Sequence, residues 1–179
     1  MPYFILGCAP GRPMVEGPAV DEAWWAGNLL DDPPTVPLVL KLSADGREAP
    51  ASLYDGLVPL WSDRLVSGMR KAGVDNFDAY PVTVAGPGFG REAPAYWAVN
   101  VLGLVAATDV EPSLPADEED EPADPEPEQL VINERKAGPF RMFRLAESPD
   151  LVVVDAQTRE SLERLGLTDL EFTSLGPVP

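Results

Sequence analysis

Two segments of the chain share one pattern, in which an N-capping residue opens an amphipathic helical stretch and a glycine closes it. The first segment begins at Ser62 and ends at Gly73, and the second begins at Asp155 and ends at Gly166. Ser and Asp side chains accept hydrogen bonds from the unpaired N–H groups of a first helical turn, and Gly tolerates the left-handed conformation that closes a helix. Both segments are therefore predicted to be helices of about ten residues.

Each predicted helix lies between two segments with the character of strands. The apolar runs 57–61 and 151–154 come before the helices, and the extended stretches 76–84 and 169–175 follow them. The sequence thus predicts two similar strand–helix–strand units.

A shift of 93 residues superimposes Ser62 on Asp155 and Gly73 on Gly166. The same shift superimposes the apolar faces of the two helices, which carry Leu65, Met69 and Ala72 in one unit and Thr158, Leu162 and Leu165 in the other. This match favours an internal duplication. Two unrelated amphipathic helices with ordinary caps would align about as well, so that interpretation stays open, and both give the same elements.

Further strands are predicted where β-branched and aromatic residues lie between Pro and Gly, at 2–6, 37–42, 96–105, 129–133 and 140–145. In the last of these, Arg141 and Arg144 are expected to project toward solvent or acidic partners. The glycine-rich segment 86–90 is expected to connect a hairpin. Because strands outnumber helices and do not alternate with them, the predicted fold is α+β, with a mostly antiparallel or mixed sheet and a few short helices.

One acidic segment separates the two units. Of the net charge of −17, residues 109–128 carry −10, with ten acidic residues, five prolines and no Lys or Arg, and the rest of the chain carries −7. Such a segment repels itself and cannot bury apolar surface, so we expect a disordered or extended loop inserted into a single domain, 1–179. Charge runs of this kind are usually solvated loops, and that interpretation is favoured here. The alternative is that the densest part contacts a basic partner, through Asp117, Glu118, Glu119, Asp120 and Glu121.

The composition excludes several classes of site. The chain has no histidine and one cysteine, which excludes Ser-His-Asp and Cys-His catalysis, histidine-ligated zinc and an internal disulfide. No calcium loop or nucleotide-binding glycine pattern is present, so no metal or cofactor is expected. An enzyme that uses carboxylates alone stays open, but no pair stands out among the 30 acidic residues.

The strongly acidic charge disfavours nucleic acid and anionic membranes as ligands and favours a basic protein partner.

The longest apolar run, 96–107, is too short to span a bilayer and is interrupted by Asn100, so we expect a buried strand or pair of strands there. A cytoplasmic location is expected from the single thiol and the lack of a targeting segment.

Trp24 and Trp25 are the second candidate contact for a partner. Tryptophan is enriched at the residues that dominate binding energy, so an exposed pair could anchor a partner. At least one of the two is expected to pack on the core instead.

Five motifs occur in order along the chain: LWSDRL (60–65), FDAYPV (77–82), YWAVNVL (96–102), FRL (143–145) and LGLTDLEF (165–172). In this order they resemble a family of bacterial immunity proteins from polymorphic and contact-dependent toxin systems. The resemblance runs from about residue 54 to the end, while residues 1–53 match less distinctly. Family members commonly carry Ser where this chain has Asp155, and the Gly of a Leu-Thr-Gly motif where it has Asp169.

The resemblance implies a non-enzymatic antidote that binds and neutralises a toxin made by the same cell, and it supplies no catalytic residues. The main alternative is an acidic interaction module, such as an inhibitor or adaptor of another basic cellular protein. The motifs predict neither the oligomeric state nor the identity of the partner.

Overall fold

The computed structural model describes residues 2–9, 15–17, 22–42, 50–56, 58–85, 95–108 and 130–175. Within these ranges it has eleven strands and three short α-helices, which confirms the α+β prediction. The helices are α1 (Asp63–Lys71), α2 (Glu134–Ala137) and α3 (Ala156–Arg164), with one 3₁₀ turn at Glu22–Trp24. The strands are β1 (Tyr3–Cys8), β2 (Val15–Glu16), β3 (Leu38–Leu42), β4 (Leu53–Tyr54), β5 (Leu60–Ser62), β6 (Phe77–Ala85), β7 (Tyr96–Val101), β8 (Leu104–Val105), β9 (Met142–Leu145), β10 (Ser148–Asp155) and β11 (Leu170–Ser174).

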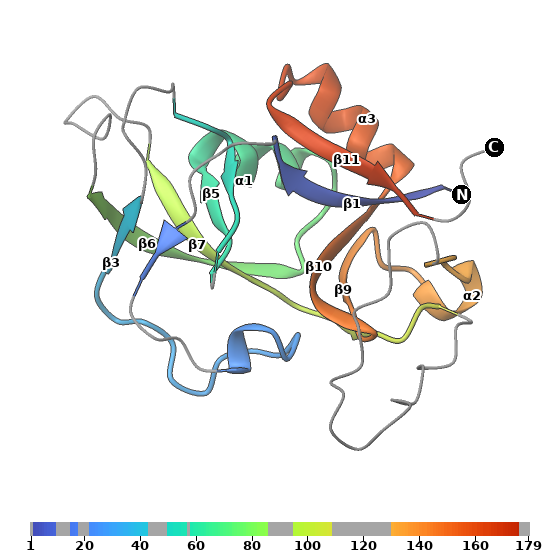
Figure 1. Cartoon of the computed structure of the whole chain (residues 1–179), viewed down its shortest axis with the longest axis horizontal. Helices are drawn as coiled ribbons and strands as arrows, with labels where there is room; N and C mark the ends of the chain where they lie inside the picture. Colours follow the sequence, from blue (N-terminus) through green and yellow to red (C-terminus); the bar gives the residue numbers. More distant parts are fainter. Residues whose placement is uncertain are drawn as a thin grey trace, which may run out of the picture.

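The strands form two mixed sheets that lie side by side (Figure 1). The first sheet has the order β11-β1-β10-β9-β8, and its neighbours are antiparallel except for β8 and β9. The second has the order β2-β3-β6-β7-β5-β4, and only β3 and β6 are parallel.

The two predicted units have the same topology as well as the same elements. In the second sheet, β7 lies between β5 and β6 and is antiparallel to both. In the first sheet, β1 lies between β10 and β11 and is antiparallel to both. Each unit is therefore a split strand–helix–strand motif whose central strand comes from elsewhere in the chain.

The predicted caps form as the residue types indicated. The Ser62 hydroxyl accepts a hydrogen bond from the Leu65 backbone N–H at 3.2 Å, and the Asp155 carboxylate accepts one from Thr158 at 2.7 Å. Gly73 and Gly166 follow the helices with φ of 80° and 73°, a region where side chains other than glycine are strained. These local interactions fix both helix ends.

Two arginines link α1 and α3, one at each end of the helix pair. Arg64, in the first turn of α1, donates from Nη2 to the Leu165 carbonyl at the end of α3, at 2.7 Å. Arg141 donates from Nη1 to the Ala72 carbonyl at the end of α1, at 2.5 Å, and from Nε to the Asp155 cap of α3, at 3.1 Å. A cation at a helix C-terminus is favourable because the last carbonyls are unpaired and partly negative.

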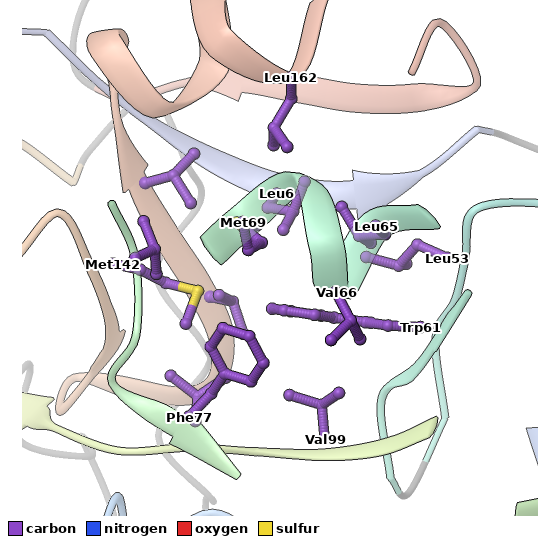
Figure 2. Packing of buried hydrophobic residues seen from close by; sticks show 14 of the residues in the cluster. Leu6, Leu53, Trp61, Leu65, Val66, Met69, Phe77, Val99, Met142 and Leu162 are labelled. Atoms are coloured by element: carbon purple, nitrogen blue, oxygen red, sulfur yellow. The ribbon is translucent and has the colours of Figure 1, made fainter. Parts of the chain in front are cut away.

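The core between the sheets is built around this helix pair (Figure 2). Met69 of α1 and Leu162 of α3 are wholly buried. A side chain on Gly68 would lie 3.1 Å from Leu167 and 3.2 Å from Leu162, so glycine is what allows the helices to approach closely. Strands of both sheets complete the cluster with Leu6, Leu53, Trp61, Phe77, Val99 and Met142.

The prediction that Arg144 projects outward is wrong. The residue lies in β9, an interior strand with both faces covered, and it is 0% exposed. Phe143 and Leu145 point into one hydrophobic cluster, so the alternation of the strand turns Met142 and Arg144 toward the space between the sheets. Arg141 precedes the strand and is partly exposed while it joins the two helices.

The apolar segment 96–105 forms a pair of strands, which is one of the two expected alternatives, because the chain turns at Gly103, with φ of 108°, and β7 and β8 enter different sheets. Two other sequence predictions need correction. Of the strand expected at 129–133, the described part forms only an isolated bridge from Ile132 to Thr108 before α2 begins. Leu165 is 38% exposed, because α3 ends at Arg164 and Leu167 fills the core instead.

Leu162→Ala is expected to lower the free energy of unfolding by about 3 kcal/mol, because it leaves a cavity between the helices. Leu165→Ala is the matched control and should cost less than about 1 kcal/mol, because that side chain is already partly in water. Urea denaturation of both variants measures the difference. Equal losses would contradict the assigned helix face.

Candidate functional site

A cavity of about 510 Å³ lies between the two sheets, with walls from β1, β9 and β10 of the first and from β2, β4 and β5 of the second. The cavity borders the core cluster, since Leu6, Leu53 and Trp61 belong to both. We call it the inter-sheet cleft, and its polar and aromatic lining is Trp25, Asp55, Trp61, Arg144 and Asp150.

Arg144 is the charged residue on the buried wall of the cleft. Its Nη1 donates to the Pro149 carbonyl at 2.7 Å, while Nε and Nη2 are buried and have no hydrogen-bond partner among the described residues. Burial lowers the pKa of Arg144 to about 10, against the opposing effect of the nearby Asp150 carboxylate. The guanidinium therefore stays charged at neutral pH, with two donors unused.

Trp61 contributes a third unused donor. Its indole ring packs against Phe77, with ring centroids 5.3 Å apart, and the residue is 0% exposed. Nε1 is also buried and without a hydrogen-bond partner in the described part of the chain. Buried donors are normally paired, and both residues with these unpaired donors line the same cavity, which makes the cavity a candidate binding site.

The mouth of the cleft is acidic. Asp55 and Asp150 line the cavity but are exposed, unlike Arg144. The Asp55 carboxylate accepts a hydrogen bond from the Cys8 backbone N–H at 3.2 Å, and the Asp150 carboxylate accepts one from the Ser148 hydroxyl at 2.7 Å. The cleft thus has a positive buried wall and a negative entrance.

The two neighbouring tryptophans, Trp24 and Trp25, lie in different environments. Trp24 is 5% exposed and packs edge-on against Tyr80, with ring centroids 5.5 Å apart, so it is the one of the pair that belongs to the core. Trp25 is half-buried, lines the inter-sheet cleft and also lines a neighbouring hollow of about 720 Å³ together with Glu22 and Asp150. Of the two, Trp25 is therefore the one available to a partner.

The five acidic candidates, Asp117 to Glu121, lie outside the described residues, as does the whole segment 109–128. The hairpin connection at 86–90 lies outside them as well, although the strands on either side, β6 and β7, pair antiparallel.

Asp169 joins the two halves of the molecule. Its carboxylate accepts hydrogen bonds from the Ser52 backbone N–H at 2.5 Å and from the Ser52 hydroxyl at 2.7 Å. None of the described residues other than glycine has a positive φ, so Asp169 bears no backbone strain. Its side chain therefore links the segment after α3 to the residue that precedes β4.

No three His, Cys, Asp or Glu side chains among the described residues lie close enough to hold one metal ion. No helix within the described ranges is long and apolar enough to cross a membrane.

The sequence interpretation missed Arg144 as a site residue because it placed the side chain in solvent. The available signal was its position between apolar neighbours in the segment MFRL, which is typical of a strand buried on both faces.

A family model described as the immunity protein family Imm11 matches residues 27–176. This match begins well before Tyr54, which is where the resemblance found in the sequence motifs begins. Comparison with curated protein sequences gives no match.

The reactivity of the Cys8 thiol can be used to test the environment beside the cleft. Burial, aided by the Asp55 carboxylate, raises the pKa of its thiol to about 11, so at pH 8 about one thiol in a thousand is ionised. Because the thiolate is the reactive form, we expect a disulfide reagent to modify the folded chain roughly a hundredfold more slowly than the urea-unfolded chain. Asp55→Asn should speed the reaction, and equal rates for folded and unfolded chains would contradict the assignment.

Proposed function

The chain belongs to the Imm11 family of immunity proteins, and from this membership we propose that it neutralises one bacterial toxin by binding it directly, without catalysing a reaction. The family supplies the toxin-neutralising role. The proposal adds that the chain acts as a stoichiometric inhibitor, in the cytoplasm of the cell that makes the toxin. The absence of histidine supports it, since Ser-His-Asp and Cys-His catalysis and histidine-ligated zinc sites all need an imidazole.

We place the contact surface at the inter-sheet cleft, and the observation that carries this assignment is its set of buried, unpaired donors beside a half-exposed tryptophan. Binding hot spots are typically aromatic or arginine side chains in pockets from which the partner excludes water. Trp25 and Arg144 have these residue types and this location.

The partner's surface is proposed to be basic. The net charge of −17 attracts a positive protein over several ångströms of solvent, and the exposed Asp55 and Asp150 carry that preference to the mouth of the cleft. The same charge repels nucleic acid.

Co-expression with a candidate toxin domain tests the proposal. We expect the chain to restore growth and to co-purify with the toxin in a fixed ratio. Growth restored without a complex would contradict direct binding, and a complex that does not protect would contradict neutralisation.

Trp25→Ala is expected to weaken toxin binding by at least about tenfold and to lower the free energy of unfolding less than Trp24→Ala does, because this side chain is partly exposed at the cleft. Trp24→Ala is the matched control and should instead lower the free energy of unfolding by about 3–5 kcal/mol, because the ring is in the core. Calorimetric titration and thermal unfolding separate the two effects. Unchanged affinity in Trp25→Ala would remove this residue from the interface.

Deleting residues 109–128 is expected to leave the fold intact and to slow toxin association, most strongly at low salt, because the segment carries −10 of the net charge. The control replaces the segment by an uncharged linker of equal length. Stopped-flow association rates across a salt series measure the effect. Rates equal to those of the intact chain at low salt would show that the segment is only a spacer.

A further inference from the structure

The inter-sheet cleft has donors that match one particular chemical group. Nε and Nη2 of Arg144 lie on the same edge of the planar guanidinium, the edge that donates two parallel hydrogen bonds to the two oxygens of a carboxylate. The opposite side of the group is held in place by the bond from Nη1 to the Pro149 carbonyl at 2.7 Å. The unused edge therefore has a fixed orientation.

No carboxylate in the described part of the chain occupies this edge. Asp150 is the one whose charge reaches Arg144, yet the described residues contain no ion pair between them. The Asp150 carboxylate is instead held by the Ser148 hydroxyl at 2.7 Å. A buried charge with unpaired donors is costly in the free protein, and a carboxylate from outside would remove that cost.

We infer that the inter-sheet cleft receives a carboxylate side chain of the toxin, which accepts two hydrogen bonds from Arg144 while a neighbouring Lys or Arg of the toxin lies against Asp55 and Asp150. This inference rests on the proposed function. The side chains around the cleft shift to admit the group, as interface rotamers commonly do on docking.

The acidic mouth of the cleft decides where the carboxylate comes from. A free organic acid must pass Asp55 and Asp150 and is repelled by a protein of net charge −17. A carboxylate on a basic protein surface is not repelled in this way, because the Lys and Arg side chains around it are attracted to the same two aspartates. The charge pattern of the cleft therefore favours an acidic side chain of the toxin that is surrounded by basic side chains.

Peptide probes test this chemistry without the toxin. The full-length, ¹⁵N-labelled protein is titrated with acetyl-Lys-Glu-Lys-amide, with the matched acetyl-Lys-Gln-Lys-amide and with acetate, while the Arg144 Nε–H resonance is followed. We expect the Glu peptide to shift this resonance and to bind at least about tenfold more tightly than either control, because a charged bidentate acceptor is stronger than a neutral amide.

Substitutions of two arginines distinguish a binding role from a structural one. Arg144→Met should abolish the preference for the Glu peptide and leave the thermal midpoint unchanged or higher, because it removes a buried unpaired charge. Arg144→Lys should also lose the preference, since it lacks the two-donor edge. The control Arg141→Met should lower the midpoint, because it breaks the bonds to Ala72 and Asp155, but keep the peptide preference.

Several results would overturn the inference. Equal binding of the two peptides, or a preference that survives in Arg144→Met, would show that no carboxylate binds there. Acetate binding as tight as that of the Glu peptide would make the cleft a site for free acids. Toxin that binds Arg144→Met as tightly as the wild type would refute the inference and leave the proposed function standing, whereas toxin that does not bind the wild type would refute the proposed function itself.

Discussion

The antiparallel packing of α1 against α3 is the contact on which the rest of the structure depends. Each helix connects two strands of a different sheet, so the contact between the helices helps to set the angle and spacing of the two sheets. Gly68 sets the close approach, and Arg64 and Arg141 prevent the helices from sliding, because each ties one helix to the end of the other. The inter-sheet cleft is bounded by the same two sheets and shares residues with the same core.

The sequence predicted what local interactions determine. Ser62, Asp155 and the two closing glycines act within a few residues of themselves, so both helices and their ends followed from residue types. The β6–β7 hairpin also followed from a local signal, the glycine-rich segment 86–90. The pairing of β1 with β10 and of β7 with β5 joins residues distant along the chain, which no local pattern encodes.

The site was harder to predict than the fold for the same reason. Arg144 looked like a solvent-facing residue until its strand was found in the interior of a sheet, and Trp24 and Trp25 are neighbours in sequence with opposite environments. In each case the environment is set by residues remote in sequence. A stable core that includes Trp61 and Met142 lets the protein retain unpaired donors beside the cleft, a local cost that is typical of binding sites.

The central claim is that a toxin docks on the inter-sheet cleft, and amide hydrogen exchange of the free and toxin-bound chain tests it most directly. The account predicts slower exchange in the complex at Trp25 and the residues that follow it, at 53–61 and at 144–152, with the solvent face of α3 unchanged. Slowing confined to α3 or to the outer strands, with the cleft segments exchanging as in the free chain, would contradict it.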